Sequence, residues 1–296
     1  MLPLEKDLQI RKKNLDEFLA LSIRILNYFP HVVSGKEEKY PYVIFSSSIA
    51  GATKYIRPIN RNLFIENSDS LRVEFEVFRG LLRSISPNSD LLDEVDIALI
   101  DRVVYTLAQS IGAGLDLLVN ANSSRKHVGN RFEELVKCLF DEIGISNKKS
   151  ILQIPYDTEE GEKIYKCEND LILSPFKMVE SGNKSIHPSE VVVSVKTTSK
   201  DRMGKMFIDK MLLEKFVGHP PKVIGIFLND VQRKEDNSIS YTLVSGLFMV
   251  YTKFLTRLEG VYYLDPPPNA LKEPFKRHMK PFSELLLKDI WHLLAT

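Results

Sequence analysis

The strongest constraint on the fold comes from the order of segments between residues 123 and 229, where one helical pattern precedes four short β-favouring runs. Ser123 can cap this helix, and its apolar residues recur three or four positions apart, at Phe132, Val136, Leu139, Phe140 and Ile143. The runs that follow are ILQIPY, YKCENDLILSPF, EVVVSVKTT and KVIGIFLND, each bounded by turn residues or charges. Because the helical segment RMGKMFIDKMLLEKF separates the last two runs, the order predicts a mixed α/β core with a crossover helix.

The first 120 residues are mostly helical in pattern. Apolar positions recur at helical spacing over residues 15–26, which predicts a first helix. Over residues 29–58, charged, proline and glycine residues surround one short apolar run, so we expect a loop-rich connection there. A long helix is expected after Asp90, interrupted near Gly112 and Gly114, because one face carries the apolar residues Leu91, Leu92, Val95, Leu99, Val103 and Leu107.

The C-terminal part contains further apolar runs, a proline break at residues 266–268 and a closing helical pattern, PFSELLLKDIWHLL. Tyr251 and Tyr262 fall in runs that we expect to form strands. A chain of 296 residues of which 44% are hydrophobic can bury a substantial core without disulfides or metals. We therefore expect one compact domain, mostly helical over residues 1–120 and mixed α/β over residues 121–296.

Composition excludes several classes of protein. The two cysteines, Cys138 and Cys167, are too few for a disulfide framework and lack the paired spacing of a zinc site. No window approaches about 18 consecutive apolar residues, and the first apolar run is too short for a signal peptide. We therefore expect a cytoplasmic protein with no membrane partner. The net charge of +1 leaves a polyanionic partner open, because binding to nucleic acid depends on local clustering of charge.

Three charged residues fall at positions of the core where they can act together. Glu133 lies on the first helix of the core, Asp170 precedes the apolar run LIL, and Lys196 ends the run VVVSVK. Because side chains alternate along a strand, Ser194 and Lys196 point to one face and Val195 packs on the other. Carboxylates at strand ends can bind a hard cation such as Mg²⁺, and a nearby lysine can contact a phosphate. This set suits phosphodiester hydrolysis, although acids near strand ends are common and most such lysines simply reach solvent.

The residues around the lysine make the pattern more specific. Residues 194–196 (Ser-Val-Lys), followed by residues 200–202 (Lys-Asp-Arg), resemble the PD-(D/E)XK nucleases, in the branch of type II restriction endonucleases that read CCGG or CCNGG sites. That branch has Ser-Val-Lys in place of acid-x-Lys and carries the missing acid on the helix after the lysine. Asp209 matches the position of that acid, where the family more usually has Glu. Glu214, a further turn along the helix, is the less favoured alternative.

The resemblance extends to the preceding helix. There the matching residues are Arg125, Gly129, Phe132 and Glu133. By this resemblance Glu133 is the helix carboxylate, with Glu134 as the competing assignment. The matching segment spans residues 123–216, roughly a third of the 296 residues, and the remainder of the chain contributes nothing to the resemblance.

The triplet Lys200, Asp201 and Arg202 carries groups that suit base recognition. A guanidinium group matches the O6 and N7 atoms of guanine, an ammonium group can reach the same atoms, and a carboxylate accepts a hydrogen bond from cytosine N4. With Ser199 as a candidate N-cap, we expect the triplet on the first turn of the helix, facing DNA. Residues 196–215 contain six Lys or Arg and three Asp or Glu, so this stretch is locally basic. The alternative is that the triplet is only a solvated helix start.

The resemblance implies a Mg²⁺-dependent type II restriction endonuclease, with a mixed central sheet flanked by helices and a helical N-terminal elaboration. It implies that Asp170 and Asp209 bind the metal, and that Glu133 and Lys196 complete the catalytic set. The substrate would be double-stranded DNA with a short palindrome, cut by a homodimer or a higher oligomer, and residues 1–120 would serve dimerisation or DNA contacts. Two alternatives stay open: a repair or junction nuclease that reads DNA structure, and a DNA-binding protein without catalysis.

Overall fold

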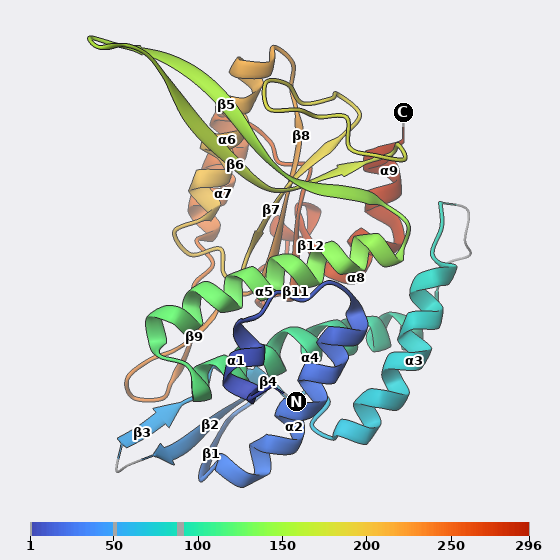
Figure 1. Cartoon of the computed structure of the whole chain (residues 1–296), viewed down its shortest axis with the longest axis vertical. Coiled ribbons are helices and arrows are strands. Elements are labelled where there is room, and N and C mark those ends of the chain that lie inside the picture. The colour runs from blue at the N-terminus through green and yellow to red at the C-terminus, as the bar shows by residue number, and fades with distance from the viewer. Residues whose placement is uncertain (1, 50–51, 88–91, 296) are drawn as a thin grey trace.

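The computed structural model describes residues 2–49, 52–87 and 92–295 (Figure 1). The elements of the N-terminal part are α1 (Leu4–Gln9), α2 (Leu15–Val32), β1 (Gly35–Lys39), β2 (Tyr42–Ile49), β3 (Ala52–Tyr55), β4 (Ile59–Asn60), α3 (Ser68–Ser84) and α4 (Glu94–Leu118). They are followed by α5 (Ala121–Glu142), β5 (Ser146–Thr158), β6 (Gly161–Ser174), β7 (Val191–Lys196), α6 (Met203–Val217) and β8 (Lys222–Asn229). The C-terminal part contains β9 (Val231–Arg233), β10 (Ile239–Tyr241), α7 (Ser245–Phe254), β11 (Gly260–Asp265), β12 (Met279–Pro281), α8 (Phe282–Glu284) and α9 (Ile290–Leu294).

Residues 29–58, which we expected to form a loop-rich connection, contain most of an antiparallel sheet, so that expectation is wrong. In this sheet β2 pairs with β1, β3 and β4. Strand β1 (GKEEK) is exposed at four of its five positions, so it lacks the apolar alternation from which strands are predicted. The sheet is anchored by β2, which buries the consecutive side chains of Tyr42, Val43 and Ile44.

Helix α4 is continuous, contrary to the interruption expected near Gly112 and Gly114. Both glycines permit close packing. A Cβ atom at Gly112 would lie 2.5 Å from the guanidinium group of Arg57, and one at Gly114 would lie 3.1 Å from the side chain of Ile25. The two glycines therefore let α4 pack closely against the Arg57 side chain and against α2.

The long helices begin at residues other than those expected. Helix α4 is capped by Asp93, whereas Asp90 and Leu91, where we expected it to start, lie outside the described residues. Helix α5 is capped by Asn120, whose side chain accepts the backbone N–H of Ser123, so Ser123 lies inside the first turn. The helices themselves are present where the apolar periodicity predicted them.

A mixed sheet forms the centre of the molecule, with the strand order β12-β11-β8-β7-β6-β5. Strands β7, β8, β11 and β12 are parallel, whereas β6 is antiparallel to both β7 and β5. The β5–β6 hairpin is long and projects from the body of the protein (Figure 1). Helix α6 connects the parallel neighbours β7 and β8. The predicted mixed α/β class and its crossover helix are confirmed.

The two faces of the central sheet pack against separate apolar layers, because side chains alternate along each strand. On β7, Val193 and Val195 belong to the layer that contains helices α2, α3, α4 and α5. Val192 belongs to the other layer, with α6 and α7. Ser194 and Lys196 line a cavity together with residues of α6, so they point away from Val195 as predicted.

The segment around Tyr251, which we expected to be a strand, forms helix α7, so that expectation is wrong. Its aromatic and β-branched residues favour strands in isolation, but tertiary packing decides the outcome. The rings of Phe248 and Tyr251 lie 5.6 and 5.5 Å from the ring of Phe207 on α6. These contacts fix α7 against α6.

One apolar layer joins the N-terminal part to the α/β core. Its buried residues run from Leu8 to Leu294 and include the N-terminal helices and one face of the central sheet. A buried polar contact reinforces the junction, because Asn60 on β4 donates its amide to Asp265 on β11 at 2.9 Å. Among the described residues, no helix combines the length and apolar character needed to cross a membrane.

Candidate active site

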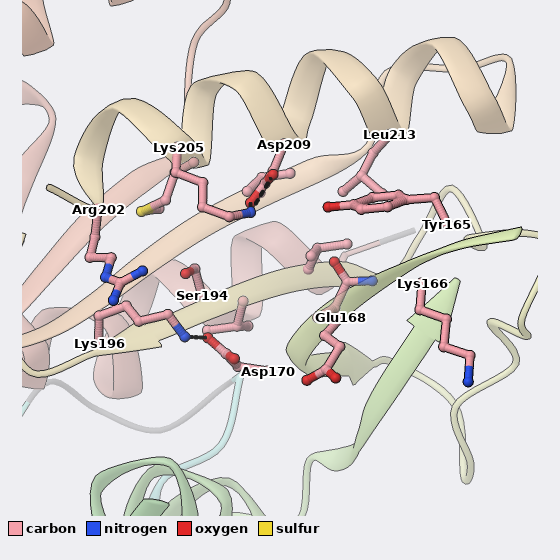
Figure 2. Close-up of a pocket in the computed structure, with 15 residues that line it drawn as sticks. Tyr165, Lys166, Glu168, Asp170, Ser194, Lys196, Arg202, Lys205, Asp209 and Leu213 are labelled. Atoms are coloured by element: carbon pink, nitrogen blue, oxygen red, sulfur yellow. Dashed lines mark hydrogen bonds and ion pairs between the residues drawn. The ribbon is translucent and has the colours of Figure 1, made fainter. Parts of the chain in front are cut away.

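A cavity of about 340 Å³ opens between strands β6 and β7 and helix α6 (Figure 2). Its base is apolar and includes Val192, Met206 and Leu213. Its walls include Tyr165, Asn169 and Ser194 and the following basic side chains and carboxylates: Lys166, Lys196, Arg202 and Lys205 with Glu168, Asp170 and Asp209. The cavity thus brings together four cations and three carboxylates, among them four of the sequence-predicted site residues, Asp170, Lys196, Arg202 and Asp209.

Asp170 and Lys196 form the centre of the sheet wall of this cavity. Lys196 Nζ donates a hydrogen bond to Asp170 Oδ2 (Figure 2). The backbone N–H of Val195 donates to the same oxygen at 2.9 Å. The pairing of β6 with β7 covers Leu171 to Leu173, so Asp170 stands just beyond the paired residues. The Asp170 side chain is 12% exposed and that of Lys196 31%, so solvent screens this contact less than one on an open surface.

Glu133, on α5, lies at the edge of the Asp170–Lys196 pair. Its Oε1 atom is 3.8 Å from Lys196 Nζ. Partial burial raises the pKa of Glu133, the charge of Asp170 raises it further, and Lys196 acts in the opposite direction. Glu133 therefore interacts electrostatically with both members of the pair.

The competing carboxylates lie elsewhere. Glu134 accepts the backbone N–H of Lys12 at 2.8 Å and the guanidinium group of Arg131 at 2.7 Å. It therefore ties α5 to the N-terminal segment. Glu214 lies further along α6 than Asp209 and is not among the described residues that line the cavity. Glu133 thus lies beside the Asp170–Lys196 pair, and Asp209 lines the cavity. The competing residues Glu134 and Glu214 do neither.

Asp209 lies on the helix wall of the cavity. Lys205, one turn earlier on α6, donates to both carboxylate oxygens of Asp209, at 2.7 and 2.5 Å (Figure 2). Partial burial lowers the pKa of Lys205, but the hydrogen bond to Asp209 and its negative charge outweigh that effect, so the pKa is raised. The cavity therefore contains one ion pair on its sheet wall and one on its helix wall.

The donor set fits a hard divalent cation. Asp170 and Asp209 present carboxylate oxygens to one cavity, and these are the ligands that Mg²⁺ prefers. Within the described residues, no three His, Cys, Asp or Glu side chains are grouped closely enough to hold a metal by themselves. Mg²⁺ is usually held by one or two carboxylates together with waters and substrate phosphates, so such a group is not required. The residues therefore fit a cation that is shared with a phosphate.

The triplet Lys200, Asp201 and Arg202 lies in the turn before α6, so the expected place on the first helical turn is wrong. Asp201 has a φ of 58°, a left-handed conformation that a right-handed helix cannot continue through. All three side chains are exposed, and Arg202 extends into the cavity beside Lys196 (Figure 2). The triplet is thus presented on an open turn next to the catalytic candidates.

Asp230 fixes this turn. Its buried carboxylate accepts the hydroxyl of Thr198 at 2.8 Å, and both the backbone N–H and the hydroxyl of Ser199 at 2.7 and 2.5 Å. The hydroxyl of Tyr263 also donates to it at 2.8 Å. Burial, and then the charge of Asp230, raise the pKa of Tyr263. Because Ser199 is bound to Asp230, it does not cap α6, which corrects the predicted N-cap.

The role of Asp230 was missed from the sequence, although a signal was present. Asp230 follows directly after the apolar strand β8. The parallel neighbour β7 ends at Lys196, opposite Phe227 of β8. Since the carboxyl ends of parallel strands meet at one edge of a sheet, a polar residue just after β8 is placed to contact the turn after Lys196.

The comparisons with known proteins identify the fold. Neither a protein family nor a curated protein matches the chain. Among solved structures, the type IIP restriction endonuclease Kpn2I is similar, with a TM-score of 0.73 at 16% identity, over 98% of this chain and 97% of that chain. The restriction endonuclease PspGI, in complex with its substrate DNA, gives a TM-score of 0.47 at 15% identity, over 76% of this chain and 90% of that chain. The chain therefore has the fold of a type IIP restriction endonuclease along nearly its whole length.

The raised pKa of Glu133 predicts a pH-dependent loss of stability. The folded protein holds the Glu133 proton more tightly than the unfolded chain does, so stability falls as pH rises from the ordinary value of 4.5 through the raised pKa. Glu133→Gln removes this loss. We expect its free energy of unfolding to match that of the wild type in acid and to exceed it increasingly toward neutral pH, in urea titrations.

Glu162→Gln, on the exposed β5–β6 hairpin, is the matched control and should follow the wild type throughout. A Glu133→Gln variant that became less stable than the wild type as pH rises would show that attraction to Lys196 exceeds the effect of burial.

The hydrogen bonds that Asp230 accepts lead to a second prediction about the stability of the folded protein. Asp230→Asn replaces an acceptor by an NH₂ group that faces the donors of Thr198 and Ser199, so buried donors lose their partners. We expect the free energy of unfolding to fall by about 1–3 kcal/mol, measured by urea unfolding. Asp157→Asn, at an exposed hairpin position, should leave it unchanged. Equal stability of the two variants would contradict the role of Asp230.

Proposed function

We propose that the protein is a sequence-specific, Mg²⁺-dependent endonuclease that cuts double-stranded DNA, a type II restriction enzyme of the PD-(D/E)XK superfamily. One observation carries the proposal: the Asp170–Lys196 pair, with Glu133 beside it, faces a charged cavity in a chain that has the fold of a type IIP restriction endonuclease. Asp170 on β6 and Lys196 at the end of β7 would bring a carboxylate and an ammonium group to one phosphate.

The residues have distinct roles in this proposal. Asp170 and Asp209 would hold Mg²⁺, which when bound stabilises charge on the phosphate and lowers the pKa of water. Lys196 donates from the end of β7 and orients the attacking water or a non-bridging oxygen of the scissile phosphate. Glu133 supports the site electrostatically, since its carboxylate contacts Lys196 and its pKa responds to Asp170.

Recognition of the DNA sequence is assigned to Lys200, Asp201 and Arg202. Guanidinium and ammonium groups bind guanine O6 and N7, and a carboxylate accepts from cytosine N4, so the three side chains suit adjacent G·C pairs. The exposed turn held by Asp230 supports this role, because it fixes the backbone and leaves the three side chains exposed toward solvent, where a groove of DNA can approach them. By resemblance, the site is a short palindrome that contains CCGG or CCNGG, read by a homodimer or a higher oligomer.

Two other functions use parts of the same site. A repair or junction nuclease would employ the same carboxylates and lysine on a target chosen by DNA structure. A DNA-binding protein without catalysis is the other alternative, because Ser194 stands where many nucleases of this superfamily have an acid. The open turn with three charged side chains favours sequence reading over both.

Digestion of a phage genome with Mg²⁺ tests the proposal directly. We expect discrete fragments whose sequenced ends share one palindrome with G·C pairs, because a fixed triplet reads fixed bases. Random ends, or cleavage confined to branched DNA, would favour a structure-specific nuclease. Absence of cleavage on any DNA, with binding retained, would favour the binding protein.

Lys196→Ala separates catalysis from binding. We expect cleavage to fall by at least about a hundredfold, because the variant lacks the ammonium group that stabilises charge at the phosphate. Binding to the same duplex in Ca²⁺ should persist, measured by gel shift. Lys215→Ala, at an exposed position in the last turn of α6, is the matched control and should cleave like the wild type. Full activity of Lys196→Ala would remove Lys196 from the catalytic set.

A further inference from the structure

A second cavity, of about 470 Å³, lies away from the Asp170–Lys196 pair, where β3, β9 and the beginning of α5 meet (Figure 1). Residues from these separate parts of the chain share its lining, with Tyr55 from β3, Gln232 and Arg233 from β9, and Arg125 from α5. The residues assigned to cleavage and base reading do not include any of these four. The cavity therefore needs an explanation of its own.

The charge of this cavity is strongly positive. Four basic side chains and one carboxylate line it: Lys54, Arg57, Arg125 and Arg233 with Asp116. Asp116 already accepts hydrogen bonds on both carboxylate oxygens, because Arg57 donates to each of them at 2.8 Å and Ser124 donates to one at 3.0 Å. Lys54 Nζ donates a hydrogen bond to the backbone carbonyl oxygen of Leu117 at 2.9 Å. The positive charge of Arg125 and Arg233 is therefore not neutralised within the cavity.

Arg125 and Arg233 differ in how far their side chains are held in place before a ligand binds. Arg125 is exposed, and in the described part of the chain it forms no hydrogen bond or ion pair. Arg233 is held in place, since its guanidinium group lies 4.3 Å from the ring centroid of Tyr55 and donates to Asn237 Oδ1 at 2.8 Å. One cation is thus free to adapt to a ligand and the other is preorganised.

A smaller cavity lies between this cavity and the strand end that carries Lys196. Arg57 also lines this smaller cavity of about 170 Å³, which it shares with Thr197 and Thr198, the residues directly after Lys196. The base-reading turn makes a second connection, because Lys200 Nζ lies 3.4 Å from Gln232 Oε1. A ligand long enough to occupy the cleavage site can therefore follow this surface from one cavity to the next.

We propose that this cavity binds the sugar–phosphate backbone of duplex DNA outside the bases that the Lys200–Arg202 turn reads, with Arg125 and Arg233 as the phosphate ligands. The inference rests on the proposed function, since it assumes a duplex at the cleavage site. Guanidinium groups bind phosphates through two parallel N–H donors, and an unneutralised pair of them favours a polyanion. The contact adds affinity and fixes the orientation of the DNA, and it leaves the recognised sequence unchanged.

The salt dependence of DNA binding tests this contact. The wild type, Arg125→Gln and Arg125→Lys are compared on one duplex that carries the cleavage site and on one that lacks it, in Ca²⁺ and over a series of salt concentrations. Each phosphate contact contributes about one unit to the slope of log K against log salt concentration. We expect Arg125→Gln to lower the slope by about one unit on both duplexes, Arg125→Lys to restore it, and the sequenced cleavage ends to stay the same.

Lys126→Gln is the matched control. Lys126 is the exposed neighbour of Arg125 on α5 but does not line the cavity, so its variant should keep the slope of the wild type. Equal slopes for Arg125→Gln and Lys126→Gln would overturn the inference while leaving the nuclease proposal intact. Altered cleavage ends in Arg125→Gln would also overturn it, because the contact would then be to bases. A wild type that binds neither duplex would remove both proposals.

Discussion

The position of the end of β7 is the constraint on which the site depends. This strand is buried between two apolar layers, so Val193 and Val195 determine which way Ser194 and Lys196 point. Where its pairing with β6 ends, one oxygen of Asp170 accepts both the backbone N–H of Val195 and the ammonium group of Lys196. A shift of one residue in strand register would turn Lys196 into the opposite layer and break both bonds.

The sheet wall of the site could be predicted from the sequence because it depends on local alternation, whereas the turn after it depends on distant contacts. The run VVVSVK by itself determines the face on which Lys196 lies. Asp209, which the resemblance placed on the helix after the lysine, also lines the cavity. The conformation of the Lys200–Arg202 turn follows from Ser199 binding Asp230, 31 residues later. The residues of the turn itself do not indicate this distant hydrogen bond, so the sequence predicted a helix at this position.

The N-terminal sheet could not be predicted for a similar reason. Strand β1 carries its charges at exposed positions, and the sheet is fixed by contacts to the C-terminal half of the chain. The ring of Tyr42 lies 6.3 Å from that of Tyr241, and Asn60 donates to Asp265. Burial at this junction raises the pKa of Asp265 to about 6. The same junction sets Tyr55 against Arg233, so the basic cavity exists only because two regions distant in sequence are joined.

In the proposed function, the two ion pairs of the cavity would link metal binding to DNA binding. Asp170 and Asp209 are each held by a lysine, so their negative charges are compensated without a metal. A divalent cation held by these carboxylates would compete with Lys196 and Lys205 for the carboxylate oxygens, and the ammonium groups would then face the cavity with less counter-charge. A DNA phosphate would supply that negative charge, and its oxygens would serve as further ligands of Mg²⁺. Under the proposed function, each partner would therefore lower the free-energy cost of binding the other, and such a coupling is reciprocal.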